Sequence, residues 1–302
     1  MSETNARAGA AGRRISPGRI LIGLVVLLLL AYGSAMVWLV TQETRLVFRA
    51  GRALGEARPP FPFEQIDLPR SDGARQFAWV MPYASGDARG SDGAASSAPW
   101  LLFLHGNAAS IATRGNIARY AELRALGLNI LAPEYRGFGG LDGVPAEAAL
   151  AADARVAFDY LALSRQVPPS RIVIYGWSLG SAVALHLASQ VTPAAVILEG
   201  APASIVAIGQ QQYPWFPIRL LMRNPFESIA RIRNVHAPLL FLHSPEDAVV
   251  PFGEGRRLYE AAHPPKRLVE VRGGHIHAND VDGAAFFGAI DTFLAEHGVL
   301  RH

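Results

Sequence analysis

After two early strands, short apolar runs alternate with helical patterns from about residue 100 onward. Most of these runs are largely apolar and do not alternate with polar residues, which is typical of strands buried on both faces of a parallel sheet. Because helical patterns separate them, the order favours one large α/β domain with a mostly parallel, doubly wound sheet. Strands are predicted at 63–68, 76–82, 100–105, 129–134, 171–175, 195–199, 238–243 and 267–271, and helices at about 114–126, 146–163, 179–190, 253–262 and 283–296.

Two segments of the expected domain, 63–302, interrupt this alternation. Residues 84–98 are rich in Gly, Ala, Ser and Asp, and their composition predicts a flexible hairpin loop. Residues 201–236 follow the end of a strand and carry a run of aromatic and apolar side chains, including Trp215 and Leu220. We therefore expect a small cap insertion over the carboxyl ends of the strands.

The longest uncharged run lies near the N-terminus. Residues 20–40 contain no charge, and as a helix they would span about 31 Å, close to the bilayer core of about 30 Å. A cleavable signal peptide is the alternative, because small residues at 33–35 could form a cleavage site. The apolar run continues to Val40, which favours an uncleaved transmembrane anchor between a basic tail, 1–19, and a linker, 41–62.

The orientation of this anchor is not decided by the positive-inside rule alone. Four arginines precede the segment and four follow it closely. A short basic tail before a large domain usually stays in the cytoplasm. We therefore expect a single-pass protein with its domain outside the cytoplasm, on the periplasmic side of a bacterial inner membrane.

Composition narrows the possible chemistry. The formal net charge is +3, from 28 basic and 25 acidic residues, and this balance argues against a nucleic-acid partner. The chain has no cysteine, which excludes a thiol nucleophile, a cysteine zinc site and any disulfide.

A serine stands between a predicted strand and the helix that follows it. Residues 176–180 read Gly-Trp-Ser-Leu-Gly directly after the apolar run that ends at Tyr175. In a strand–turn–helix context this pattern predicts a nucleophile elbow, a strained turn that lifts the serine oxygen clear of the sheet. Glycines on either side avoid clashes between Cβ atoms and the neighbouring strand and helix. We therefore expect Ser178 to be a nucleophile.

A serine hydroxyl needs a base within hydrogen-bond reach, and the base needs an orienting acid. Asp247 and His275 each follow a predicted strand, and His275 comes directly after a Gly-Gly turn. Carboxyl ends of parallel strands meet at one edge of a sheet, so these side chains are expected to meet Ser178 there. Glu246 is a rival acid, and His277 is an alternative base.

Two backbone N–H groups could stabilise an oxyanion next to this serine. One belongs to Leu179, and the other to Asn107 in the His-Gly-Asn-Ala sequence after a predicted strand. His105 and His243 end strands, but no carboxylate cluster stands beside them at ligand spacing, so we expect no zinc site. Hydrolysis by a serine nucleophile requires no metal, and we expect no cofactor. We interpret His105 as a brace of the oxyanion loop and Glu199 as a loop-bracing acid.

These motifs together resemble the serine hydrolase branch of the α/β-hydrolase superfamily over about residues 60–296. The closer resemblance is to the BEM46-like, abhydrolase domain-containing group, which shares His-Gly-Asn-Ala, Tyr-Arg-Gly-aromatic-Gly and Gly-x-Pro-x-Glu, here at 105–108, 135–139 and 143–147. The chain departs from this group at three loop positions: Glu134 replaces a frequent Asp, Leu141 a usual serine, and Gly140 a common polar residue.

The resemblance implies hydrolysis of carboxylic esters or thioesters through an acyl-enzyme. Members of the group include lysophospholipid hydrolases and protein depalmitoylases, and many are anchored in a membrane. The apolar cap and the anchor favour a lipid-like or acyl-chain substrate. A serine peptidase or amidase is the alternative within the same fold, and a non-catalytic binding protein is the alternative outside enzymes.

Overall fold

The computed structural model describes residues 16–50, 55, 57–70, 72–83 and 98–301. The chain divides into two compact units, Met1–Gln42 and Glu43–His302. Our expectations for residues 1–15 of the tail, for 51–54 and 56 of the linker and for 84–97 of the hairpin loop lie outside the described residues.

Helix α1 (Pro17–Phe48) contains the predicted apolar span. Among the described residues it is the one helix long and apolar enough to cross a membrane, with a mean hydropathy of 2.6 over 18 residues. The helix continues through 41–48, where we expected a linker. The cause is tertiary packing, because Phe48 and Glu43 are buried in the second unit. Such packing stabilises a helical turn that local propensity would leave marginal.

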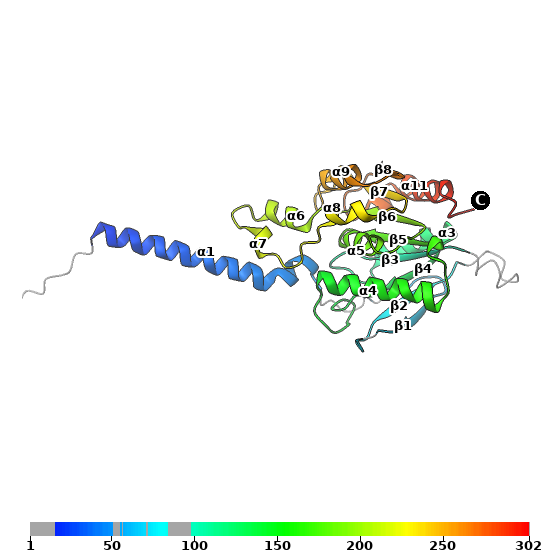
Figure 1. Cartoon of the computed structure of the whole chain (residues 1–302), viewed down its shortest axis with the longest axis horizontal. Coiled ribbons are helices and arrows are strands. Elements are labelled where there is room, and N and C mark those ends of the chain that lie inside the picture. Colours follow the sequence, from blue (N-terminus) through cyan, green and yellow to red (C-terminus); the bar gives the residue numbers. More distant parts are fainter. Residues whose placement is uncertain (1–15, 51–54, 56, 71, 84–97, 302) are drawn as a thin grey trace, which may run out of the picture. The chain divides into compact units, whose positions relative to one another are not determined.

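The second unit is built on an eight-stranded sheet with the strand order β1-β2-β4-β3-β5-β6-β7-β8 (Figure 1). Strands β3 to β8 run parallel, whereas β2 is antiparallel to both of its neighbours. All eight predicted strands are confirmed to within two residues at each end: β1 (Glu64–Asp67), β2 (Phe77–Met81), β3 (Trp100–Leu104), β4 (Asn129–Pro133), β5 (Ile172–Trp177), β6 (Ala195–Glu199), β7 (Leu239–His243) and β8 (Lys266–Glu270).

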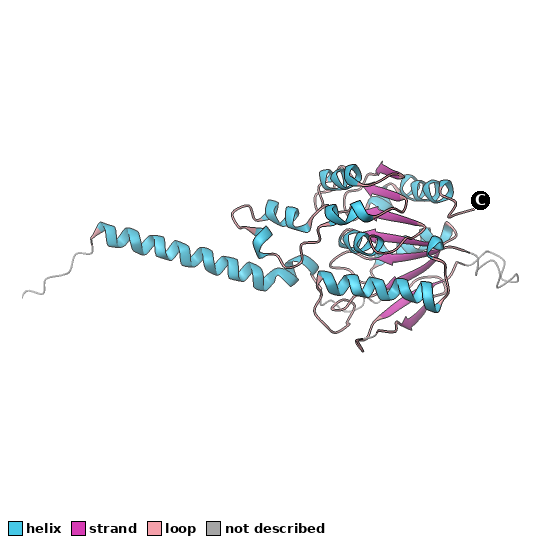
Figure 2. Cartoon of the chain, viewed as in Figure 1, coloured by secondary structure: helices cyan, strands magenta, loops and turns pink. Residues whose placement is uncertain are grey.

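Helices cover both faces of this sheet (Figure 2). The five predicted helices are confirmed as α3 (Arg114–Ala125), α4 (Glu147–Asp159), α5 (Leu179–Ala188), α9 (Phe252–Ala261) and α11 (Gly283–Glu296). Helix α4 passes into a π-helical turn, η1 (Tyr160–Ser164), and a 3₁₀ turn, η2 (Pro169–Arg171), precedes β5. Helix α10 (Ala278–Val281) is a single turn, too short for a periodic pattern to reveal.

The core has two halves because side chains alternate across the strands. Leu102 and Ile174 pack on the face covered by α4, α5 and α9, whereas Leu101 and Val173 pack on the face covered by α3 and α11. Every residue of β3 to β7 is buried, which is why these strands read as continuous apolar runs.

Residues 201–236 leave the carboxyl end of β6 and form short helices, α6 (Ile205–Gln212), α7 (Ile218–Leu221), α8 (Ser228–Arg231) and the 3₁₀ turn η3 (Ile232–Asn234). We call this segment the cap. Its base is fixed by the Glu147 carboxylate, which accepts from the Phe226 N–H over 2.7 Å and contacts Arg231. The Asn224 Oδ1 atom accepts from the Glu147 N–H over 2.8 Å in return.

Candidate active site

Ser178 lies in the turn between β5 and α5. Its φ of 54° and ψ of −119° are rare for a residue with a side chain, a strain worth about 1–3 kcal/mol. A Cβ atom on Gly176 would overlap the Gly180 carbonyl, and one on Gly180 would overlap the Leu104 carbonyl. The Ser178 N–H donates to the Glu199 carbonyl over 2.8 Å. The spacing of the glycines therefore permits a turn that other residues could not make.

The structure brings Ser178, His275 and Asp247 together in a continuous chain of hydrogen bonds. The distance from His275 Nε2 to Ser178 Oγ is 2.8 Å, and that from His275 Nδ1 to Asp247 Oδ2 is 2.7 Å. An ionised carboxylate only accepts hydrogen bonds, so Nδ1 carries the ring hydrogen and donates a hydrogen bond to Asp247. The other nitrogen, Nε2, then accepts from the serine hydroxyl, as a general base must.

The loop that carries His275 is held over the end of β5. Gly273 and Gly274 adopt φ values of 105° and 65°, which redirect the chain after β8. The Trp177 indole N–H donates to the His275 carbonyl over 3.3 Å. His277 does not reach Ser178: its side chain is 68% exposed and lies 3.5 Å from Asp280.

Asp247 lies in the loop between β7 and α9 and is surrounded by donors. Its Oδ1 accepts from the N–H groups of Val249 and Val250, each over 2.8 Å. Burial raises the pKa of Asp247, but hydrogen bonds from His243 and His275, together with the Val250 N–H, outweigh it and hold the pKa well below the usual carboxyl range. The neighbouring Glu246 is exposed and accepts from the Gly273 N–H over 3.3 Å.

His243 contacts Asp247, a contact that we did not predict from the sequence. Its Nε2 atom donates to the Val250 carbonyl over 2.9 Å and lies 3.4 Å from Asp247 Oδ2. A Cβ atom on Gly255 of α9 would overlap the His243 ring, so the glycine makes room for it. The sequence did hold one signal for this contact: Gly255 lies inside the predicted helix 253–262, which follows the strand that ends at His243.

The proposed oxyanion donors flank Ser178. Strand β3 pairs with β5 with Leu104 opposite Gly176, so the residues after β3 run beside the elbow. A Cβ atom on Gly106 would lie 3.3 Å from Ser178 Cβ, which shows how closely this loop approaches. Among the described residues, the N–H groups of Asn107 and Leu179 donate to no other protein group. Both can therefore serve a ligand.

His105 and Glu134 form a buried pair behind this loop. The His105 Nε2 atom lies 2.8 Å from Glu134 Oε1, and its Nδ1 atom lies 2.8 Å from the Gly106 carbonyl. The second carboxylate oxygen accepts from the Ile111 N–H over 3.2 Å. The long Glu134 side chain fits because Gly139 carries no Cβ atom, which would overlap the carboxylate.

The end of helix α1 also holds the oxyanion loop, a contact that sequence reasoning missed. The last carbonyls of a helix lack partners within it. Here the Val47 carbonyl accepts from Asn107 Nδ2 over 3.0 Å, and the Phe48 carbonyl accepts from the Ala108 N–H over 3.1 Å. Ala108 has a φ of 52°, so these contacts stabilise a strained loop.

Glu199 and Arg119 form a second buried pair that reaches the His275 loop. Arg119 Nη2 donates to Glu199 Oε1 over 2.6 Å and to the Ile276 carbonyl over 3.4 Å, and Tyr175 also contacts Glu199. The Arg119 guanidinium lies 4.4 Å from the centre of the Trp177 ring. Burial lowers the pKa of Arg119, but the Glu199 carboxylate outweighs this and raises it, so Arg119 stays charged.

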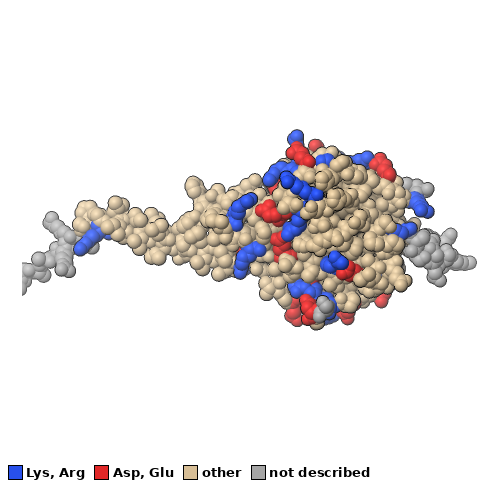
Figure 3. Space-filling model, viewed as in Figure 1, with Lys and Arg blue, Asp and Glu red and all other residues tan. Residues whose placement is uncertain are grey.

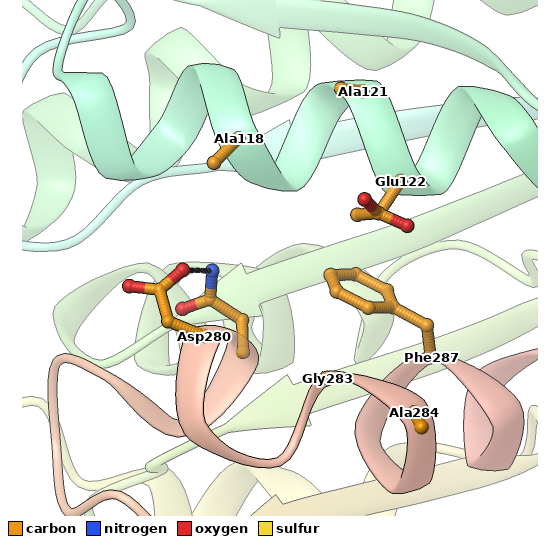
Figure 4. Close-up of a pocket in the computed structure, with 8 residues that line it drawn as sticks. Ala118, Ala121, Glu122, Asp280, Gly283, Ala284 and Phe287 are labelled. Carbon is orange, nitrogen blue, oxygen red and sulfur yellow. Dashed lines mark hydrogen bonds between the residues drawn. The ribbon is translucent and has the colours of Figure 1, made fainter.

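A surface pocket of about 580 Å³ lies between α3 and the α10–α11 segment (Figure 4). Its lining includes Glu122 and Asp280, and the Asn279 amide donates to Asp280 over 2.8 Å. Ser178, Asp247 and His275 are not among its lining residues. This pocket is therefore separate from the candidate active site.

Comparison with known proteins agrees with the architecture. The model of the alpha/beta hydrolase family matches residues 101–265. The uncharacterized protein Rv2307c of Mycobacterium tuberculosis is 38% identical, covering 93% of this chain and 97% of that protein. The lysophosphatidylserine lipase ABHD12 of Danio rerio is 32% identical over 57% of this chain and 50% of that protein.

A solved structure gives the same result for the fold. The esterase Pf2001 of Pyrococcus furiosus superposes with a TM-score of 0.66 and 19% identity, covering 81% of this chain and 97% of that one. The family match spans more than half of the chain, and a relative covers nearly all of it. The chain therefore belongs to the alpha/beta hydrolase family.

Proposed function

We propose that this protein is a membrane-anchored serine hydrolase that cleaves carboxylic ester or thioester bonds through an acyl-enzyme. The observation that carries this proposal is the chain of hydrogen bonds from Ser178 through His275 to Asp247. The strained elbow and the two unpaired N–H groups beside it support the same chemistry. The family membership and the esterase and lipase relatives support ester hydrolysis over other reactions of this fold.

In the first half-reaction, Ser178 Oγ attacks the carbonyl carbon while His275 Nε2 takes the hydroxyl proton. The N–H groups of Leu179 and Asn107 stabilise the negative charge on the carbonyl oxygen. Collapse of the intermediate breaks the bond to the leaving alcohol or thiol, which receives the proton from His275. The acyl group is then bound to Ser178.

In the second half-reaction, a water molecule attacks the acyl-enzyme and His275 takes its proton. The acid product leaves and Ser178 regains its hydrogen. Asp247 fixes the tautomer of His275 and stabilises the imidazolium that forms in both halves. Burial raises the pKa of Asp247, but its hydrogen bonds lower the pKa by more, so Asp247 stays ionised in this role.

The substrate class we infer is lipid-like. An acyl chain suits a protein whose first helix is long and apolar enough to span a membrane. The zebrafish relative is named as a lipase of lysophosphatidylserine, which supports an amphiphilic ester as substrate. We place the hydrolase unit on the periplasmic side and the arginine-bearing residues 1–19 in the cytoplasm.

The proposed nucleophile is tested by labelling the detergent-solubilised full chain with a fluorophosphonate probe. We expect Ser178→Ala to lose all labelling and to lower kcat for short acyl esters by about 10⁶-fold. Ser189→Ala, at the other end of α5, is the matched control and should behave as wild type. Labelling that persists in Ser178→Ala would show that another residue is the nucleophile.

The substrate class is tested on the same preparations with esters and thioesters of increasing acyl length. We expect kcat/KM to rise with chain length until the chain fills the site. Activity on acyl peptides without activity on esters would instead indicate a peptidase.

A further inference from the structure

The cap has an unusual composition for an exposed segment. Between Ala201 and Phe226 the sequence contains no acidic residue, and its charged residues are Arg219 and Arg223. By contrast, basic and acidic side chains are mixed over the face of the second unit shown in Figure 3. This part of the cap therefore presents mainly apolar groups, and its two arginines lie beside carboxylates outside it: Arg219 is 3.9 Å from Glu227 and Arg223 is 3.1 Å from Glu43.

The tip of the cap, residues 213–222, exposes large apolar side chains. Trp215 and Leu220 are each 84% exposed, and Pro214 and Pro217 are exposed beside them. In a soluble protein, large apolar side chains exposed together mark an interaction site. Tryptophan and arginine side by side are typical of surfaces that meet the headgroup region of a bilayer.

This tip is an ordered structure. The Gln210 side chain donates to the Phe216 carbonyl over 3.0 Å and accepts from the Ile218 N–H over 3.2 Å. Ile218 is buried and anchors α7, and Ser204 caps the N-terminus of α6 over 3.2 Å. The exposed position of Trp215 is therefore fixed by the fold.

The base of the cap is bonded to the last turns of α1. Glu43 is buried, and its carboxylate accepts from the N–H groups of Arg223 and Asn224 over 2.9 and 2.7 Å. Val40, the end of the uncharged run, precedes Glu43 by about 4.5 Å of helix. Only two residues therefore separate the uncharged run from a residue that is bonded to the base of the cap.

We propose that the tip of the cap inserts Trp215 and Leu220 into the interfacial region of the phospholipid bilayer that holds α1. The largely exposed Arg219 side chain then faces lipid phosphates, and the site receives its substrate from the same leaflet. This inference rests on the membrane anchoring in the proposed function. The occupant is the bilayer because only two residues separate the uncharged run from Glu43 at the base of the cap, and because the tip combines exposed apolar side chains with Arg219.

The absence of cysteine makes a direct test available. Leu220→Cys is labelled with the polarity-sensitive dye NBD, and the full chain is reconstituted in vesicles of phosphatidylcholine and phosphatidylglycerol. Leu163→Cys is the matched control, because Leu163 is 74% exposed and lies in η1, before the amino end of β5, whereas the cap leaves the carboxyl end of β6. We expect blue-shifted emission and quenching by nitroxide-labelled lipid at position 220 and neither effect at position 163.

Each other result of this experiment has a defined meaning. Equal, water-like emission at both positions would overturn the docking of the cap. Flotation with the vesicles tests the anchor, and fluorophosphonate labelling of the same sample tests the serine. Both can succeed while the dye at position 220 remains in water, so failure of the docking is distinct from failure of the proposed function.

The functional consequence is tested with Trp215→Ser and Leu220→Ser combined, against Leu163→Ser. On a long-chain ester embedded in vesicles, we expect the double variant to lose at least about tenfold in kcat/KM, as expected for loss of apolar contacts. On a soluble short ester, both variants should match wild type. Equal activity of the double variant on the embedded ester would contradict the proposal.

Discussion

Single residues around the serine show how the site combines strain with hydrogen bonding. The elbow holds Ser178 in a strained conformation, and two buried pairs, His105–Glu134 and Arg119–Glu199, support the loops on either side. Arg119 is a positioning residue in this interpretation, since it bonds the carbonyl next to His275 rather than the serine. The functional groups are thus fixed before a substrate binds, as pre-organised electrostatic stabilisation requires.

The two histidines of the His-x-His sequence give a sharp comparison at this scale. We expect His275→Ala to lower kcat for ester hydrolysis by about 10⁶-fold, because Ser178 loses its base. His277→Ala should remain within about threefold of wild type, because its side chain is exposed and distant from the serine. Initial rates on a soluble ester measure both. Equal losses in the two variants would contradict the assignment of the base.

The pKa of Asp247 makes a separate prediction about stability. Burial raises this pKa, and hydrogen bonds from two histidines and a backbone N–H lower it further than burial raises it. A carboxyl whose folded pKa is lowered stabilises the protein above its unfolded pKa, about 3.9, and loses this contribution as pH falls toward the folded pKa. We therefore expect the Tm difference between wild type and Asp247→Asn to be constant from pH 8 to 5 and to shrink below about pH 4.

The control for this measurement is Glu246→Gln, since Glu246 is exposed. It should show little change in Tm at any pH. A difference between wild type and Asp247→Asn that grows on acidification would contradict the lowered pKa. Activity should also fall in Asp247→Asn, by about 10⁴-fold at neutral pH, since the imidazole loses its orienting carboxylate.

Elements differ in how far the sequence alone could predict them. Strands β3 to β7 were predictable because burial on both faces leaves continuous apolar runs. The expectation that Ser178, Asp247 and His275 meet rested on the strand ends of a parallel sheet. The last turns of α1 were not predictable. Their partners, Asn107, Ala108, Arg223 and Asn224, are distant in sequence, and no local pattern marks a buried Glu43. The contact of His243 with Asp247 was missed for the same reason.

Glu43 provides the test of this element. We expect Glu43→Ala to reduce the free energy of unfolding by about 2–4 kcal/mol, because buried donors on Arg223 and Asn224 lose their acceptor. Glu43→Gln keeps one acceptor oxygen and should lose less. The measurement is denaturant unfolding of the full chain in detergent micelles. The exposed Glu64 is the control site, and Glu64→Ala should change little. A fully stable Glu43→Ala would contradict the role of this contact.

At the scale of the whole molecule, the proposed membrane anchor raises the question of which side of the membrane the hydrolase unit faces. The family membership fixes the sheet, but the fold alone does not place it on one side of a membrane. Four arginines precede residues 20–40 and four closely follow them, so the positive-inside rule does not choose an orientation. A cysteine-free chain allows this orientation to be measured with one introduced thiol.

Leu163→Cys reports the side of the hydrolase unit, and Ser2→Cys reports the side of the tail. With the full chain produced in a Gram-negative bacterium, we expect a membrane-impermeant maleimide to label position 163 in intact spheroplasts. Position 2 should react only after the membrane is permeabilised. The reverse pattern would place the unit in the cytoplasm. Whole-protein mass spectrometry separates the anchor from a signal peptide, because an uncleaved chain keeps its 32.4 kDa, whereas cleavage after residues 33–35 would remove both the tail and most of the span.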